Sequence, residues 1–198
     1  MIMLILKRVF LVILLVMIPH FVLAATWKID PAHTAVEFKV RHLMISWVKG
    51  VFTEVAGTVE INEADLATSS VNIQIEIKSI NTNNEKRDMH LRSPDFFDVS
   101  KYPKMTFASK NVLVADGTPV KIVGDLTIRD VTREVEFTVE DFSQTMTDPW
   151  GNTRRGATAT TKINRKDYGL TWNKALEAGG VVVGDEIRIS LEVEMIKG

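Results

Sequence analysis

The chain has 198 residues, with 24 Lys and Arg against 25 Asp and Glu, four His and no Cys. This length suits one compact domain. The absence of Cys excludes disulfides, a Cys nucleophile and thiolate metal sites. The nearly neutral charge, without a sustained basic run, argues against nucleic acid as a partner.

Apolar residues are concentrated at the start of the chain. Lys7 and Arg8 form a positive region ahead of the apolar run Val9–Ile18. Together with the small residues that end at Ala24, this pattern is typical of a secretory signal peptide over residues 1–24. We therefore expect cleavage after Ala24 and a periplasmic or secreted body. An uncleaved anchor is the alternative, because the first six residues are also largely apolar.

The rest of the chain is dominated by the two-residue period of β-strands. Apolar and polar residues alternate most clearly over 34–42, 71–78, 134–140 and 186–195, and less clearly over 55–61, 105–114, 120–128 and 157–163. With a short opening strand at 27–29, the pattern predicts eight or nine strands.

One segment, Asn84–Arg92, has the start and stop signals of a helix, with an Asn as N-cap and Pro94 beyond its end. A second helical turn is expected over residues 43–47. One helix cannot cover the apolar faces of eight strands, so the sheet must cover itself as a sandwich or a closed barrel. Long strands with short connections favour an all-β, up-and-down antiparallel barrel. Its interior could be filled by side chains or hollow, and periodicity does not decide between the two.

Motifs that carry catalysis are absent: there is no nucleophile elbow, phosphate loop, zinc helix or calcium loop. His33, His42 and His90 are far apart in the sequence, so a His-only metal site has weak support. His42 shares the apolar face of its strand. It is therefore either a core histidine, bonded to backbone or to Ser46, or a polar contact near a ligand head group. His33 is expected to stabilise a turn.

The predicted helix carries Arg87 and is followed by the apolar residues Leu91, Phe96 and Phe97. This segment is expected to cover one barrel end. If the cover has a function, it is that of a lid or portal. The segment Asn164–Gly169 is polar and ends a strand, which predicts a turn. Its cations, Arg165 and Lys166, could instead bind an anionic head group.

Three tryptophans, Trp47, Trp150 and Trp172, fall near loops or strand ends. Each is expected to plug a barrel end, and together they could frame an apolar entry.

Six blocks of sequence, taken in order, carry a resemblance to a known family. They are Asp30–Thr34 with Val36-x-Phe38-x-Val40-x-His42, Gly50-x-Phe52 with Gly57, Asn84–Asp98, Tyr102–Phe107, Gly124–Thr132 and Ile163–Leu170. Over nearly the whole chain from Thr26 to Ile196 the sequence resembles the YceI-like family of polyisoprenoid-binding, lipocalin-like proteins. Asp130 stands where the family often has Gly, and Thr34 where Ser is commoner.

The resemblance implies an extended, antiparallel, eight-stranded lipocalin-like barrel with a long apolar cavity. It further implies a secreted or periplasmic carrier of a long-chain isoprenoid lipid, such as a quinone precursor or a prenyl phosphate, with no cofactor and no catalysis. Transient membrane contact and a homodimer are further expectations about partners. The predicted ligand contacts are the tail-binding Val36, Phe38, Val40, Ile73, Ile75, Met105, Phe107, Leu126, Phe137, Ile189 and Leu191, and the head-group candidates His42, Arg87 and Arg165.

Two other functions stay open at this point. One is a filled barrel that serves as an accessory or stress protein of a membrane redox system, which requires an interior without a continuous cavity. The other is an enzyme, such as a lipid hydrolase or isomerase, that depends on His42.

Overall fold

A computed structural model describes residues 24–176 and 179–198, and the statements below refer to these residues. The predicted signal peptide, apart from Ala24, lies outside them. No helix in these ranges combines the length and the apolar character needed to span a membrane.

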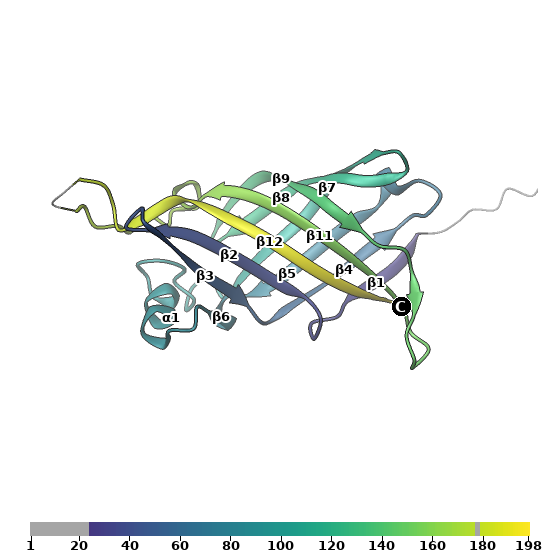
Figure 1. Cartoon of the computed structure of the whole chain (residues 1–198), viewed down its shortest axis with the longest axis horizontal. Coiled ribbons are helices and arrows are strands. Elements are labelled where there is room, and N and C mark those ends of the chain that lie inside the picture. Colours follow the sequence, from purple (N-terminus) through teal and green to yellow (C-terminus); the bar gives the residue numbers. More distant parts are fainter. Residues whose placement is uncertain (1–23, 177–178) are drawn as a thin grey trace, which may run out of the picture.

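The described chain forms a single twelve-stranded sheet with one α-helix (Figure 1). The helix α1 spans Glu85–Arg92, and three 3-10 turns lie at Leu66–Thr68, Ile77–Ser79 and Arg165–Tyr168. The strands are β1 (Ala25–Ile29), β2 (Ala35–His42), β3 (Ser46–Phe52), β4 (Val55–Ile61), β5 (Ser70–Glu76), β6 (Ile80–Asn81), β7 (Lys104–Ala115), β8 (Thr118–Ile128), β9 (Val131–Phe142), β10 (Met146–Thr147), β11 (Thr153–Asn164) and β12 (Val183–Lys197).

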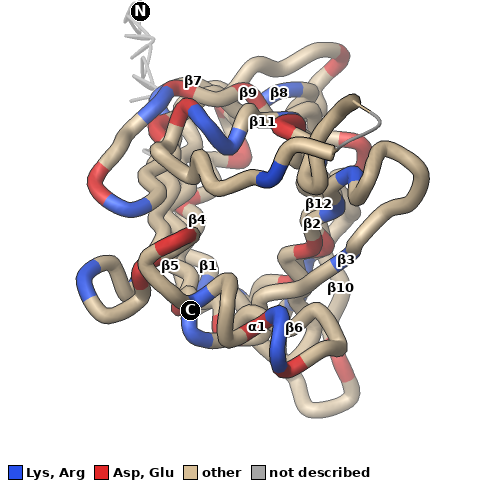
Figure 2. The backbone as a smooth tube through the Cα atoms, turned by 90° about the vertical axis from the view of Figure 1, so that its left-hand side faces the viewer, with Lys and Arg blue, Asp and Glu red and all other residues tan. Residues whose placement is uncertain are grey.

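Eight strands close the sheet into an antiparallel barrel, as predicted. The pairing order is β11-β9-β8-β7-β5-β4-β1-β12, and β12 returns to β11 along a continuous register from Arg154–Ile196 to Asn164–Glu186. Figure 2, viewed along the barrel, shows these strands as a ring. Closure pairs strand edges that would otherwise be exposed, which stabilises a domain that has no disulfides.

The first two strands share the same neighbour. β12 pairs with β1 near its end, at Trp27–Lys197, and with β2 over most of its remaining length. β3 then pairs with the other edge of β2, and β6 pairs with β3. The β2–β3 hairpin and α1 therefore lie at the same end of the barrel, opposite the C-terminus (Figure 1).

The predicted helical turn over residues 43–47 is wrong. Residues Leu43–Ile45 are a hairpin turn, and Trp47 lies within β3. Leu43 and Met44 have φ angles of 51° and 60°, in the left-handed region, and His42 pairs with Ser46 across the turn. Leu43 and Trp47, four residues apart, have the spacing of one face of a helix, but the strand pairing on both sides imposes the reversal.

The predicted helix over residues 84–92 is confirmed. The Asn84 side chain caps α1 by accepting a hydrogen bond from the Arg87 backbone N–H at 3.0 Å. Asp88 is only 4% exposed and accepts hydrogen bonds from both the backbone N–H and the hydroxyl of Thr82. These bonds fix α1 to the chain that leaves β6.

Candidate functional site

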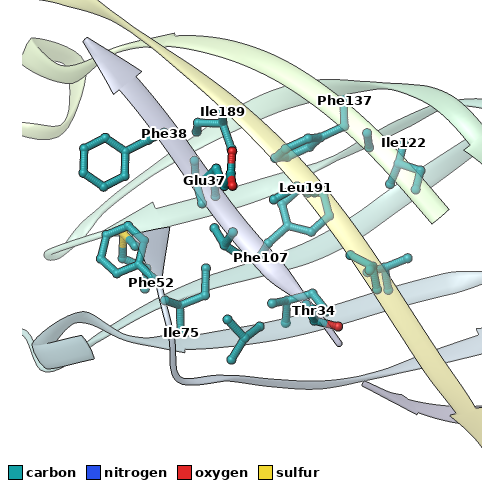
Figure 3. Close-up of a pocket in the computed structure, with 18 of the residues that line it drawn as sticks. Thr34, Glu37, Phe38, Phe52, Ile75, Phe107, Ile122, Phe137, Ile189 and Leu191 are labelled. Atoms are coloured by element: carbon teal, nitrogen blue, oxygen red, sulfur yellow. The ribbon is translucent and has the colours of Figure 1, made fainter. Parts of the chain in front are cut away.

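The barrel encloses an apolar cavity of about 250 Å³. Figure 3 shows its wall, in which Phe38 and Leu191 come from neighbouring strands and Phe107 and Phe137 come from the far side. The interior is therefore hollow. This result removes the basis for the filled-barrel alternative, which required an interior without a continuous cavity.

All the tail contacts predicted from the sequence line this cavity. They do so because side chains alternate across a strand, so one correctly placed residue fixes the direction of the others. The strand register then brings residues from distant segments together: Ile189 is opposite Phe38, Leu191 opposite Val36, and Phe107 opposite both Ile73 and Leu126.

Other cavity residues were not predicted individually. Ile122, Ala157, Ala159 and Ile163 lie on strands that were predicted, and extending the alternation along those strands would have identified them. Phe52 lies on β3, a strand that was not predicted.

Few polar side chains border the cavity, and their hydrogen bonds are made elsewhere. The Thr34 hydroxyl bonds to the backbone of Glu194, and the Ser69 hydroxyl accepts from the Asn62 N–H. Glu37 is exposed and also borders a groove on the outer surface. The wall presents almost exclusively hydrocarbon to anything inside.

Arg165 closes one end of the cavity and is only 3% exposed. Its guanidinium donates to the carbonyls of Gly184, Leu170, Trp172 and Val183 and to the Asp185 carboxylate. Burial lowers the pKa of Arg165, and Asp185 opposes that shift. These bonds engage all five N–H donors in tying the turn after β11 to the start of β12. As placed, Arg165 has no donor left for a head group.

The other two head-group candidates lie outside the cavity wall. His42 is half-buried at the end of β2, where the hairpin turn begins, and its ring has no hydrogen-bond partner among the described residues, Ser46 included. Arg87 donates to the hydroxyl and carbonyl oxygens of Thr82, each at 2.7 Å. The structure therefore does not bring His42, Arg87 and Arg165 together, and their binding role stays a prediction.

The segment around α1 covers one end of the cavity, as expected. Leu91, Phe96 and Phe97 all line it, and the Phe97 ring lies 6.0 Å from that of Phe52. Trp172 packs on the outer side of this cover, with its ring 5.3 Å from that of Phe96.

The other two tryptophans do not plug the barrel. Trp150 is 81% exposed, so its predicted role as a plug is wrong. Trp47 lies on the outer face of β3, where Arg41 and Arg188 stack on its ring, so its predicted plug role is also wrong. The two wrong predictions have the same cause: near the end of a strand, the sequence pattern does not define which side chains point outward.

The described residues include one cluster with the spacing of a metal site: Asp30, His33 and Glu194. His33 Nδ1 lies 2.9 Å from Asp30 Oδ2, which is the turn-stabilising role expected for it. Arg154 Nη1 donates to both carboxylates, at 2.6 Å to Asp30 and 2.5 Å to Glu194. A guanidinium thus already supplies the positive charge that a metal ion would bring.

Comparison with known proteins identifies the family. Residues 27–195 match the model of the YceI-like domain. The chain belongs to this family. It is 42% identical to the UPF0312 protein SA2479 of Staphylococcus aureus strain N315 over 166 residues, which cover 83% of this chain and 94% of the relative.

Solved structures share the barrel. The YCEI protein of Campylobacter jejuni is 32% identical and superposes with a TM-score of 0.67 over 85% of this chain and 96% of its own. BcnA of Burkholderia cenocepacia gives a TM-score of 0.71 at 21% identity, over 84% of this chain and 98% of BcnA. A polyisoprenoid binding domain from Saccharophagus degradans gives 0.62 at 15% identity, over 89% and 99%. The last two likenesses concern the fold alone.

Proposed function

We propose that this YceI-like protein is an exported carrier that holds the apolar tail of a polyisoprenoid, or a similar amphipathic lipid, inside its barrel. The observation that carries the proposal is the cavity of about 250 Å³ with a hydrocarbon wall. The description of the Saccharophagus degradans domain as polyisoprenoid-binding supports the same ligand class.

The size and chemistry of the cavity favour a lipid over water. An engineered apolar cavity of about 150 Å³ stays dry and binds benzene. The cavity here is larger and its wall is almost exclusively hydrocarbon, so it offers water few hydrogen-bond partners. Each methylene group of a tail that moves from water into it contributes roughly 0.8 kcal/mol. A branched hydrocarbon chain can therefore bind with few directional contacts.

The same wall limits the head group. Among the described residues, Arg165 is the one cation that lines the cavity, and all its donors are engaged within the protein. A phosphate inside the cavity would lose its hydration without gaining a partner, which is strongly unfavourable. An uncharged head group, as in a quinone precursor, therefore suits the cavity better than a prenyl phosphate does, unless the phosphate stays outside the barrel.

The protein is proposed to bind its lipid without turning it over. Among the described residues, His42 lies outside the cavity wall, the bordering hydroxyls of Thr34 and Ser69 are bonded to backbone, and Glu37 is exposed beside a groove on the outer surface. The amino-terminal signal pattern supports a periplasmic or secreted location. A protein in such a compartment could shield an apolar lipid from water between membranes.

Extraction of bound lipid tests the proposal directly. The protein is purified from its native host, extracted with organic solvent and analysed by mass spectrometry, with titration of isoprenoid lipids into the extracted protein as the second measurement. One isoprenoid lipid per protein is the expected result. A protein that is empty as purified and also fails to bind isoprenoids in titration would refute the proposal.

Two variants on β11 make the test specific to the cavity. Ala159 lines the cavity, and Ala159→Phe places in it a phenyl ring like the benzene that an apolar cavity of about 150 Å³ binds. The neighbouring Thr160 points outward and bonds to Glu140, so Thr160→Phe adds a similar ring outside the barrel. We expect Ala159→Phe to lose the lipid and Thr160→Phe to keep it.

A further inference from the structure

The outer surface at one end of the barrel combines exposed apolar residues with unpaired positive charge. Met44 and Ile45, at the tip of the β2–β3 hairpin, are 52% and 79% exposed. Behind them, Lys39, Arg41 and Lys49 lie on the outward-facing positions of the two strands. We call Met44 and Ile45 the tip, and the three cations together with Trp47 the collar.

The tip has a backbone conformation that its residues do not favour. Leu43 and Met44 adopt φ angles of 51° and 60°, whereas hairpin turns with positive φ normally use Gly, Asn or Asp. The turn is held by hydrogen bonds from the Leu43 N–H to the Val182 carbonyl (2.8 Å) and from the Ile45 N–H to the His42 carbonyl (3.1 Å). A turn that only had to reverse the chain would not need large apolar side chains facing water.

The collar gathers cations around one aromatic ring. Arg41 Cζ lies 4.4 Å from the centre of the Trp47 ring, and Lys39 Nζ lies 5.5 Å from it. Within the described ranges, Lys39, Arg41 and Lys49 form no ion pair, although Glu37 and Glu136 border the same outer groove as Lys39 and Lys49. Arg188 of β12 also stacks on Trp47, but it is paired with Glu186.

The exposed apolar residues of the β10–β11 hairpin have acidic neighbours in the sequence instead. At the opposite end of the barrel, Met146 is 65% and Trp150 is 81% exposed. Between them lies Asp148, and β9, the strand that leads to this hairpin, carries Glu140 and Asp141 just before its last residue, Phe142. Positive charge and an apolar tip therefore coincide at the β2–β3 hairpin and not at the β10–β11 hairpin.

We propose that the β2–β3 hairpin docks the protein on the surface of an anionic lipid bilayer. Apolar side chains at a tip enter the interface, Trp sits at the level of the head groups, and Lys and Arg contact lipid phosphates. Each Lys or Arg near an anionic membrane surface contributes ~1 kcal/mol of binding free energy. Each cation of the collar should therefore raise the affinity for anionic lipid about fivefold. A soluble polyanion would explain the collar but not the exposed tip.

Docking through the hairpin serves the proposed carrier function, and its biological role depends on that function. Val40, three residues before the turn, and Val183, which pairs with His42, both line the cavity. The hairpin therefore extends from the part of the wall that encloses this end of the cavity. A protein bound through the tip would hold that end near the bilayer, where a lipid enters or leaves.

Co-sedimentation with vesicles tests the docking without any cargo, so that its failure is separate from failure of lipid binding in the cavity. The probe is vesicles of equal parts phosphatidylglycerol and phosphatidylethanolamine, compared with vesicles of phosphatidylcholine. We expect the purified protein to bind the anionic vesicles, to bind the neutral ones at least tenfold more weakly, and to weaken further as salt is added.

Three double or triple variants locate the surface, each first checked for an unchanged melting temperature. Met44→Ser with Ile45→Ser, and Lys39→Gln with Arg41→Gln and Lys49→Gln, should each weaken binding at least tenfold. Met146→Ser with Trp150→Ser, at the opposite end, should leave it unchanged. No vesicle binding by the unaltered protein, full binding by the tip variant, or loss of binding in the opposite-end variant would each overturn the proposal.

Discussion

Arg154 is expected to stabilise the fold by joining three acidic side chains at the end of the barrel near the C-terminus. Its Nε donates to Asp148 at 2.6 Å, and its Nη1 donates to Asp30 at 2.6 Å and to Glu194 at 2.5 Å. The Arg154 side chain is 16% exposed, and those of Asp30 and Asp148 are 11% and 6% exposed. The change Arg154→Met keeps the apolar stem and removes the charge.

The expected loss of stability is large because three carboxylates would remain close together without a cation. Removing one partner of a buried ion pair costs roughly 3–5 kcal/mol, and the partial exposure of this cluster brings the expected value to about 3 kcal/mol. For a chain of this size, that loss lowers the melting temperature by roughly 6–12 °C. Calorimetry or circular dichroism at pH 7 measures it.

The pH dependence provides a second measurement of the same cluster. Hydrogen bonds from His33 and Arg154 lower the pKa of Asp30 to about 2. At Asp148, burial raises the pKa of the carboxyl, but hydrogen bonds from Arg154 and Asn152 outweigh this effect and keep that pKa well below its usual range. Because these pKa values are lowered by folding, the stabilisation is present above about pH 4 and is lost as the pH falls towards 2. The difference between the protein and Arg154→Met should shrink over that interval.

Lys121→Met is the matched control for Arg154→Met. Lys121 forms one exposed ion pair with Glu136, at 2.7 Å, and such pairs contribute at most about 1 kcal/mol. A melting temperature of Arg154→Met within a degree or two of that of the unaltered protein at pH 7 would show that the cluster does not stabilise the fold. A gap between them that stays constant from pH 4 down to pH 2 would contradict the assigned role of the carboxylates.

Three further substitutions test the cavity wall and the core. Phe38→Asp places a carboxylate in the apolar cavity wall and should cost at least about 3 kcal/mol in urea unfolding; unchanged stability would mean that Phe38 faces outward. Gly124→Ala puts a Cβ 2.4 Å from the Ala108 carbonyl oxygen, so a loss of roughly 1–3 kcal/mol is expected, and a variant as stable as the parent would contradict this packing. Burial raises the pKa of Tyr168 to about 12, and its hydroxyl has no hydrogen-bond partner among the described residues. Tyr168→Phe should therefore be as stable as the parent at pH 7 and should lose less stability than the parent between pH 10 and 12. A marked loss of stability at pH 7 would instead show that the hydroxyl makes a hydrogen bond.

Strands were predictable where alternation is regular and the strand lies within the barrel wall. β12 shows this best, because Ile187, Ile189, Leu191 and Val193 all line the cavity and polar residues separate them in the sequence. β3 was missed because its apolar residues Trp47, Val48 and Val51 do not alternate cleanly. The outward face of β3 carries Trp47 where a polar side chain would be usual. The alternation of apolar and polar residues that indicates a strand is therefore not visible in β3.

The head-group candidates could not be judged from the sequence, because their roles depend on contacts between distant segments. Arg165 is surrounded by carbonyls from residues 170–172 and from the first residues of β12. Nothing in the pattern around Arg165 distinguishes such a buried, fully bonded guanidinium from one that faces a ligand. Alternation assigned His42 to the cavity face, but His42 is the last residue of β2, next to the hairpin turn, and does not line the cavity.

The hollow interior has a physical origin that alternation does not reveal. Phe38 lies opposite Gly50 on β3, and a Cβ at Gly50 would come within 2.4 Å of the Phe38 ring. On the other side of the barrel, a Cβ at Gly124 would come within 2.7 Å of the Phe107 ring. Each phenyl ring thus lies against the wall, over a neighbouring strand that has no side chain at that point. A side chain in place of either glycine would clash with its ring, so these two glycines allow Phe38 and Phe107 to lie along the wall and leave the space beside them open.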